Sequence, residues 1–392
     1  MPDRGMTNVT REEMLRRAEA LVPVLRARSA ACEAARSCPD ESMADFDAAG
    51  FLRICQPACF GGYELGWDVL CEVGQILARG CGAQAWVSTV MGDHAHIASG
   101  LPLEAQEEIW GKTPMAHICA SFAPVGTARS APGGVRFSGK HGFASGIDHA
   151  QWALPGGTII DGPLKGERCL FLVPMSDVTV IDDWHVIGMA GTGSKSFSVE
   201  DVFVPEHCIL RYSDLEAATG PGNKAHSSPI FRMPHGGLAT SAFACIAVGI
   251  AEGFLADYVA MTKQRVSRGV KVAEQTGTHI SLATAAAEIE AAALLYMAPV
   301  REARRMLERG ETVPADQRMR GKRNSTYAAR TALTAVERLF YIGGSRLLFE
   351  GNAMQRAYRD LHAAATHAGL VWDVGMSDYG RHLLESEQGQ KQ

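Results

Sequence analysis

Apolar residues recur at spacings of three and four through the first third of the chain, and this pattern predicts a helical N-terminal region. Thr10 and Glu13 have the spacing of a capping box at the start of one such stripe. A second, short helix is expected from about Asp40 to Gly50, because glycine commonly follows the last turn of a helix. Two more apolar stripes predict helices, one through Val69, Val73 and Leu77 and the other through Trp86, Val90, His94 and Ile97.

The middle third of the chain has a different pattern. Between 116 and about 210 the sequence consists of short segments rich in β-forming residues, each bounded by Gly, Pro or Asp. Strands at this spacing predict a small β-barrel or β-sandwich. The stretch 214–234, which is rich in Gly, Pro and Ser, predicts a linker or loop.

The last third has helical periodicity again. Four long segments, near 236–268, 279–309, 322–350 and 352–370, predict a four-helix bundle, with Pro299 kinking the second helix. The pattern as a whole predicts a mainly α, α+β protein. Its expected parts are an N-terminal helical domain (1–115), a central β-domain (116–225) and a C-terminal helical bundle (226–392).

Composition and charge narrow the class of protein. The chain has 392 residues, 46% of them apolar and 21% charged, and its formal net charge of −5 gives no electrostatic basis for binding nucleic acid. The longest run without a charged residue or histidine, 236–251, is shorter than the ~20 apolar residues of a membrane span. The first ten residues lack the pattern of a signal peptide. We therefore expect a cytoplasmic globular protein that binds neither nucleic acid nor membrane.

Several candidate motifs fail on spacing. The ten cysteines are scattered without a C-x-x-C pair, which favours free thiols over a disulfide framework or a zinc site. His94 and His96 are two residues apart, so a helix turns them about 200° from each other and one metal ion cannot bind both. The stretch 191–196, Gly-Thr-Gly-Ser-Lys-Ser, lacks the glycine that a phosphate loop has directly before its lysine. We expect no metal, and the remaining chemistry is histidine and serine in apolar surroundings, where a core histidine satisfied by one hydrogen bond is the plain structural alternative.

Several segments, in order and over nearly the whole chain, resemble the acyl-CoA dehydrogenase superfamily. They are Phe60-Gly-Gly-Tyr63, Val135-Arg-Phe-Ser-Gly-Lys140, Gly142-Phe-Ala-Ser-Gly146, Gly188-Met-Ala-Gly191, Val199-Glu-Asp-Val-Phe-Val-Pro-Glu206 and Gln355-Arg-Ala-Tyr-Arg-Asp360. The resemblance implies a flavin held between the central β-domain and the helical bundle.

Two departures from the dehydrogenase pattern change the expected reaction. Counting from Arg359, the glutamate that abstracts a proton in similar dehydrogenases falls at Ala368, beside His367, and alanine cannot act as a base. The strand 120–124, Ala-Ser-Phe-Ala-Pro, departs from the Thr-Glu-Pro type of the dehydrogenases. Together with Gly92-Asp-His94, these departures resemble the two-component flavin-dependent monooxygenases, the group D aromatic hydroxylases.

That resemblance implies a cofactor, partners and a reaction. Such oxygenases take reduced FMN or FAD from a separate NAD(P)H:flavin reductase and add O2 at the flavin C4a. The resulting C4a-hydroperoxyflavin transfers one oxygen atom to an aromatic substrate, phenolic or polycyclic, and no metal takes part. A homotetramer is expected, because flavin sites in this family lie at subunit contacts.

The resemblance also assigns roles to the flavin-facing residues. Ser145 is expected to hydrogen-bond flavin N5, and Phe143 is expected to lie against the isoalloxazine ring. Ser121 is expected near the flavin or a substrate hydroxyl. Arg265 is expected to reach a flavin phosphate, with Arg268 as the alternative.

Two histidines are expected to act on the substrate. His367 is predicted to face flavin C4a and to take a proton from a phenol, since a neutral imidazole is suited to this near pH 7. His94 is predicted to bind a substrate hydroxyl, and His96 replaces it if the register differs by one turn.

Three alternatives remain open at this stage. The chain is alternatively an acyl-CoA dehydrogenase that oxidises a thioester with bound FAD, or a catalytically silent scaffold on the same fold. The third alternative is a monooxygenase of this fold that oxidises nitrogen or sulfur rather than carbon. The sequence does not identify the substrate or distinguish FMN from FAD.

Overall fold

The computed structural model describes residues 9–267 and 269–385, and the N-terminal region is helical as predicted. Thr10 caps the first helix by accepting a hydrogen bond from the Glu13 amide at 3.3 Å. Gly50 ends the second helix in the left-handed conformation, with φ +80°. The last of the five helices was not predicted. They are α1 (Arg11–Ala35), α2 (Asp40–Ala49), α3 (Trp67–Ala78), α4 (Gly82–Ala98) and α5 (Leu103–Trp110).

The central strands form one sheet in the order β6-β7-β2-β1-β3-β4-β8, with β5 paired to β3. Among the described residues the end strands β6 and β8 each pair with one neighbour, so the sheet does not close into a barrel, and of the two predicted forms the barrel is corrected. Closure depends on which strands pair, and strand spacing does not encode that. The strands are β1 (Ile118–Ala131), β2 (Gly134–Ala144), β3 (Trp152–Ile159), β4 (Arg168–Phe171), β5 (Val173–Pro174), β6 (Thr179–Ile181), β7 (Lys195–Pro205) and β8 (Ile209–Arg211).

The stretch predicted as a linker contains two short helices, α6 (Tyr212–Ala217) and α7 (Pro221–Ala225), so that prediction was wrong. Asn223 explains much of their order. Its Oδ1 accepts from the Gly220 amide at 3.0 Å and its Nδ2 donates to the Phe231 carbonyl at 2.8 Å. Glycine, proline and asparagine are typical both of loops and of the ends of short helices, so composition did not distinguish the two.

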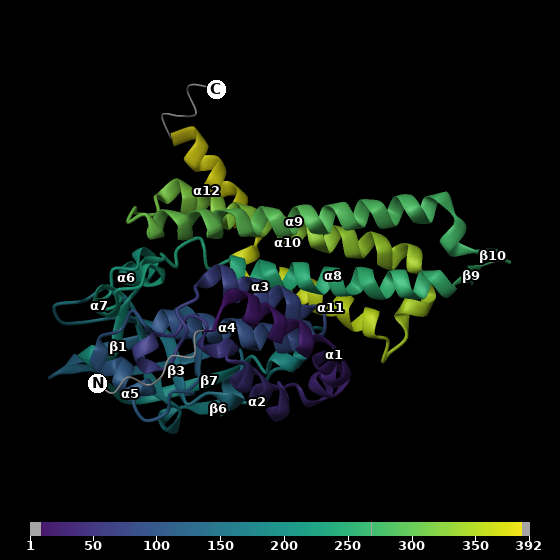
Figure 1. The fold of residues 1–392 in the computed structure, drawn as a ribbon. Coiled ribbons are helices and arrows are strands. Elements are labelled where there is room, and N and C mark those ends of the chain that lie inside the picture. The colour runs from purple at the N-terminus through teal and green to yellow at the C-terminus, as the bar shows by residue number, and fades with distance from the viewer. Residues whose placement is uncertain (1–8, 268, 386–392) are drawn as a thin grey trace.

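The C-terminal region contains the four predicted long helices with shifted bounds and a fifth that was not predicted. The helices are α8 (Ser241–Gln264), α9 (Thr276–Glu308), α10 (Ala315–Gly343), α11 (Ala353–Ala365) and α12 (Trp372–Glu385), and a two-stranded sheet of β9 (Val266–Ser267) and β10 (Val270–Lys271) follows α8. α8 to α11 form the bundle, and α12 packs on α10 (Figure 1). Helix α9 continues unbroken through Pro299.

Two bundle helices, α8 and α9, are long and apolar enough to cross a membrane by length and composition alone. The search for uncharged runs in the sequence did not detect them. A core helix of a soluble protein has the same properties, and 67% of the most apolar window of α8 is buried inside the molecule.

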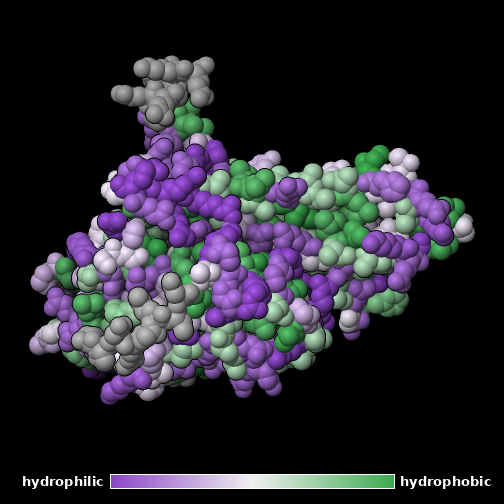
Figure 2. Space-filling model, viewed as in Figure 1, coloured by the Kyte–Doolittle hydropathy of each residue, from purple (hydrophilic) through white to green (hydrophobic). Residues whose placement is uncertain are grey.

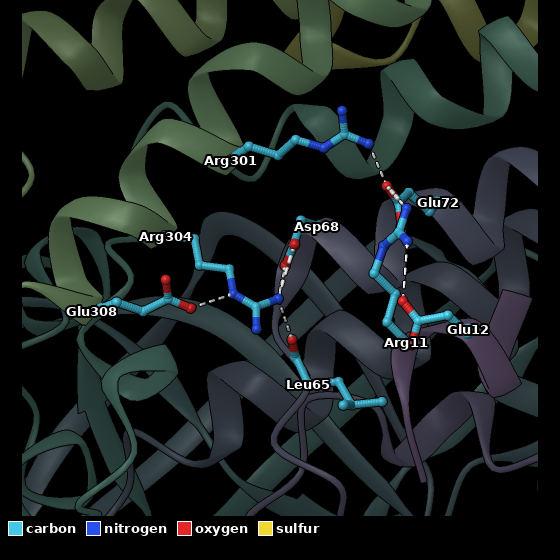
Figure 3. A network of polar contacts seen from close by, with 8 residues as sticks. All are labelled: Arg11, Glu12, Leu65, Asp68, Glu72, Arg301, Arg304 and Glu308. Atoms are coloured by element: carbon cyan, nitrogen blue, oxygen red, sulfur yellow. Dashed lines mark hydrogen bonds and ion pairs between the residues drawn. The ribbon is translucent and has the colours of Figure 1, made fainter.

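An ion-pair network joins the bundle to the N-terminal helices (Figure 3). Arg304 of α9 donates to the Leu65 carbonyl and to an Asp68 carboxylate oxygen, both at 2.8 Å. Glu72 of α3 binds Arg11 at 2.6 Å and also accepts from Arg301. The network fixes α9 against α3, with Arg11 at the start of α1 joining the same carboxylate.

A second set of contacts fixes the end of the bundle against the sheet. The Asp360 carboxylate of α11 accepts from the Met189 amide at 2.6 Å, and Arg359 donates to the Ile187 carbonyl at 2.6 Å. Gly188 lies between these two, where a Cβ would come within 2.2 Å of the Arg359 carbonyl oxygen. Because the segment after α11 carries His367, these contacts position that histidine relative to the sheet.

Candidate active site

A hydrogen-bonded chain of hydroxyls begins at the end of β2, where Ser145 was predicted to meet a flavin. Trp86 of α4 donates from Nε1 to Ser145 Oγ at 3.1 Å. Ser145 Oγ lies 2.7 Å from Ser194 Oγ, which lies 2.6 Å from Thr192 Oγ1. Thr192 donates to the Met189 carbonyl at 2.9 Å. The chain therefore connects α4, β2 and the segment that precedes β7.

The two ends of this chain fix its direction. An indole N–H only donates, a carbonyl only accepts, and each hydroxyl between them has one proton. Thr192 gives its proton to the Met189 carbonyl, so Ser194 donates to Thr192 and Ser145 donates to Ser194. Ser145 is left with one free lone pair and no free proton. It can accept a further hydrogen bond but cannot donate one.

His367 lies in contact with the same tryptophan. It is the N-cap of a short turn after α11, and its ring lies 5.4 Å from Trp86 and 3.8 Å from Phe243 of α8, measured between centroids. The structure thus brings His367 and Ser145 into contact with the same tryptophan, from sequence positions more than two hundred residues apart. Trp86 itself was not identified from the sequence as a site residue.

The protonation of His367 follows from its contacts. Its Nδ1 accepts from the Gly369 amide at 3.1 Å, so the neutral ring carries its proton on Nε2. Burial lowers the pKa of His367 to about 4, which keeps the ring neutral at physiological pH. A free Nε2–H is a hydrogen-bond donor. This arrangement does not suit the predicted role of a base that takes a proton at the free nitrogen.

The surface next to Ser145 presents an exposed aromatic ring. The Phe143 side chain is 77% exposed, and its backbone has φ +62°, an unusual conformation for a bulky residue. Trp184 lies edge-on to it at 5.8 Å, and Ile187, 75% exposed, lies in the segment bound by Arg359. An exposed aromatic ring two residues before a serine acceptor has the chemistry that fits one face and one polar edge of a flavin ring.

A second group of predicted residues lies around β1. His94 of α4 donates from Nδ1 to the Ile118 carbonyl at 2.8 Å, which leaves Nε2 without a partner among the described residues. Burial lowers the pKa of His94, so the neutral ring offers Nε2 as a proton acceptor. Ser121 donates to the Gly142 carbonyl at 2.8 Å, and Phe122 lies 5.9 Å from the His94 ring. Ser121 and Ser145 are thus linked through the end of β2.

His96 faces away from this group. Its Nε2 lies 3.4 Å from the Met233 carbonyl, and its ring stacks on Phe231 and lies 5.3 Å from Trp67. The opposite directions of His94 and His96 agree with the helical geometry expected for residues two apart. Between the two, His94 is the histidine that contacts β1, through Ile118 and Phe122.

Arg265 lies at the far end of the molecule from Ser145. It follows the last residue of α8 and donates to the Ile342 carbonyl at 3.1 Å, beside β9 at the right-hand end of Figure 1. Within one chain it therefore does not meet the other predicted flavin residues. Arg268, its alternative, lies outside the described residues.

Three of the residues that build this site were missed in the sequence. Trp86 lies on the apolar stripe of α4 and gave no separate signal, since tryptophan on such a stripe is typical of a core. Thr192 and Ser194 belong to the stretch 191–196, whose spacing does not fit a phosphate loop. Its hydroxyls bind Ser145 rather than a phosphate.

Comparisons with known proteins agree on one family. Residues 241–372 match the model of the acyl-CoA dehydrogenase C-terminal domain. The chain is 33% identical to the oxygenase subunit HsaA of a flavin-dependent monooxygenase from Rhodococcus jostii, over 90% of this chain and 94% of the relative. It is 33% identical to the oxygenase component of an FADH2-dependent resorcinol hydroxylase from Rhizobium sp., over 95% and 94%. The crystal structure of a 3-HSA hydroxylase from Rhodococcus sp. matches with a TM-score of 0.91 at 32% identity, covering 95% of this chain and 96% of that one.

Proposed function

Because the chain belongs to the oxygenase components of the flavin-dependent monooxygenases, on the acyl-CoA dehydrogenase fold, we propose that it hydroxylates a phenolic ring with reduced flavin and O2. One atom of O2 enters the ring as a hydroxyl, the other leaves as water, and the reduced flavin is oxidised. The reductase that supplies the flavin is a separate protein. The dehydrogenase alternative has no support at Ala368, where the proton-abstracting glutamate would fall.

The observation that carries this proposal is the direction of the hydroxyl chain. Reduced flavin supplies the electrons that activate O2, and its N5 bears a hydrogen that oxidised flavin lacks. Ser145 offers an acceptor and no donor, because its own proton is given to Ser194. The polar contact at N5 therefore favours the reduced form. Phe143 supports the ring face, and the indole of Trp86 holds the Ser145 hydroxyl in place.

The phenol is proposed to lie between β1 and α4. His94 Nε2 accepts the proton of the phenolic hydroxyl, because Nδ1 is committed to the Ile118 carbonyl. Ser121 lies on the strand beside it. A phenolate ring is the better nucleophile, so taking this proton helps the ring to attack an electrophilic oxygen. His367 is proposed to donate from Nε2 on the flavin side, and the apolar rings of Trp86 and Phe243 exclude water there.

The proposed assembly is a homotetramer. Figure 2 shows hydrophobic surface over α9 and the neighbouring bundle helices, where Leu294 and Ile280 are exposed. Tyr341 of α10 is 87% exposed. It precedes Ile342, whose carbonyl binds Arg265. Contact between copies through these faces would bring Arg265 of one subunit to the flavin of another. Light scattering of the purified protein measures the assembly directly.

Replacing Ser145 with alanine is expected to weaken binding of reduced flavin about tenfold, the effect of losing one hydrogen bond of roughly 1.4 kcal/mol. Affinity for oxidised flavin should change less than threefold, because oxidised N5 gives Ser145 no hydrogen to accept. Anaerobic titration with each form measures both constants. Ser130→Ala, in the same sheet and outside the site, is the matched control. Equal losses for both redox forms would contradict the assigned direction of the chain.

The function itself is tested with a flavin reductase, NADH, FMN or FAD, and a panel of phenols under 18O2. We expect one labelled oxygen atom in the hydroxylated product. An acyl-CoA that bleaches flavin bound to the protein, with no product from any phenol, would establish the dehydrogenase alternative instead. Oxidation at nitrogen or sulfur would show in the same panel when amines and thioethers are included.

A further inference from the structure

A buried carboxylate–imidazole pair lies beside the proposed phenol site and has no role in the proposed hydroxylation. Asp93 precedes His94 on α4, and its Oδ2 lies 3.3 Å from Nε2 of His235, in the segment before α8. Asp93 is only 4% exposed. Burial alone would raise the pKa of Asp93, but His235 and the neighbouring imidazoles lower it below its ordinary value. The carboxylate is therefore ionised, and its Oδ2 accepts a hydrogen bond from Nε2–H of His235.

This pairing leaves the other ring nitrogen of His235 available. Nδ1 has no hydrogen-bond partner among the described residues, just as Nε2 of His94 has none. The two imidazoles lie on one aromatic residue, because the Phe122 ring is 5.9 Å from His94 and 5.8 Å from His235. The hydroxyl of Tyr212 donates to the Phe122 carbonyl and fixes the backbone there. Two imidazoles, each anchored through one nitrogen, thus border the same short stretch of β1.

Unpaired polar atoms mark the same place. Within the part of the chain that the structure describes, Asp93 Oδ1 and Trp67 Nε1 are buried without a hydrogen-bond partner. The Trp67 ring lies 5.3 Å from the His235 ring. Buried polar groups are normally satisfied, and an acceptor and a donor left over around one imidazole indicate a missing polar ligand. An Asp93–His235 pair whose only role was to hold α4 against the segment before α8 would not require these two unpaired polar atoms.

His96 shares only the contact with Trp67, since its ring also lies 5.3 Å from that of Trp67. It is the third imidazole near Asp93, but its ring contacts Trp67 and Phe231 rather than Phe122. Its Nε2 is turned to the Met233 carbonyl. The geometry thus separates His235, which borders β1, from His96, which does not.

We propose that His235, oriented by Asp93, binds a second hydroxyl of the substrate, so that the substrate is an aromatic compound with two hydroxyl groups, one held at His94 and one at His235. This rests on the proposed function, since it assumes that a phenol occupies the site beside Phe122. A hydroxyl both donates and accepts, so it pairs with Nδ1 of His235 in either protonation state of the ring.

The test compares ligands that differ by one hydroxyl. Dissociation constants are measured by calorimetry on the purified full-length protein for phenol against resorcinol and for 2-naphthol against 2,7-dihydroxynaphthalene. In at least one pair we expect the dihydroxy compound to bind about tenfold more tightly. In His235→Gln that gain should fall to less than twofold, while the monohydroxy compound binds as before. Asp93→Asn, which keeps the imidazole but not its orientation, should also reduce the gain.

His226→Gln is the matched control. His226 also packs on an aromatic ring, that of Phe231, and it hydrogen-bonds Gln106, but it does not contact Asp93 or His235. It should keep the full gain. Equal affinities within both ligand pairs, or a gain that survives in His235→Gln, would overturn this inference and leave the proposed function intact. Failure to bind any of the four compounds would overturn both.

Discussion

Replacing His94 with alanine is expected to lower the rate of phenol hydroxylation by about 10²- to 10⁴-fold, the usual contribution of a general base. The anchored Nδ1 and the free Nε2 make His94 the acceptor for the phenolic proton, and burial keeps it neutral by lowering its pKa. Without it the phenol must ionise in solution. The remaining rate should therefore rise with pH up to the pKa of a phenol, about 10, whereas the wild-type rate should not. Product formation measured from pH 6 to 10 gives both results.

His367→Gln is the comparison for this experiment. His367 is assigned a donor role, and glutamine keeps a donor, so we expect less than a tenfold fall and no new pH dependence. A fall in His94→Ala without the rise at high pH would mean that His94 holds the substrate but takes no proton. A larger fall in His367→Gln than in His94→Ala, with the rise at high pH, would restore His367 as the base.

Relative to wild type, replacing Asp360 with asparagine is expected to raise the free energy of unfolding by about 2.4 kcal/mol more at pH 8 than at pH 4. Burial raises the pKa of Asp360 to about 6 from an ordinary 3.8. The native protein therefore holds a proton that the unfolded chain has released, and stability is lost as pH rises through 6. An asparagine oxygen accepts the Met189 amide equally well and does not ionise.

Urea unfolding at pH 4, 5, 6 and 8 measures this difference at constant protein concentration. Asp378→Asn provides the opposite sign, because Lys322 lowers the pKa of that half-buried carboxyl, so its contribution is lost as pH falls. The difference in the free energy of unfolding between Asp360→Asn and wild type could instead be the same at every pH. That result would show that Asp360 has no raised pKa in the native protein.

Most of the helices were predictable, because each amphipathic helix repeats its burial pattern every few residues. The stripe through Trp86 and His94 became α4, and the stripe through Val69 became α3. α12 and the short helices between the sheet and the bundle were missed. Short helices carry too few repeats for a period to stand out, and they depend on hydrogen bonds to residues outside the helix, such as that of Asn223 to the Phe231 carbonyl.

The candidate site was predictable only in part. Ser145, His367 and His94 were predicted as site residues because their local motifs resemble a family, and the structure joins the first two through Trp86. Their protonation was not predictable. Which imidazole nitrogen carries the hydrogen depends on a carbonyl from β1 for His94 and on a backbone amide two residues away for His367.

By itself the sequence determined the order of helical, β and helical regions and, through its motifs, the family and its flavin chemistry. Those properties depend on neighbours within a few residues, and local spacing records them. Only the tertiary structure decided that Trp86, Ser194 and Thr192 give the Ser145 hydroxyl its direction, and that Asp93 holds His235 beside Phe122. A hydrogen bond is set by distance and donor geometry at the ångström scale, between residues that the chain separates by dozens of positions, and no periodicity along the sequence specifies that.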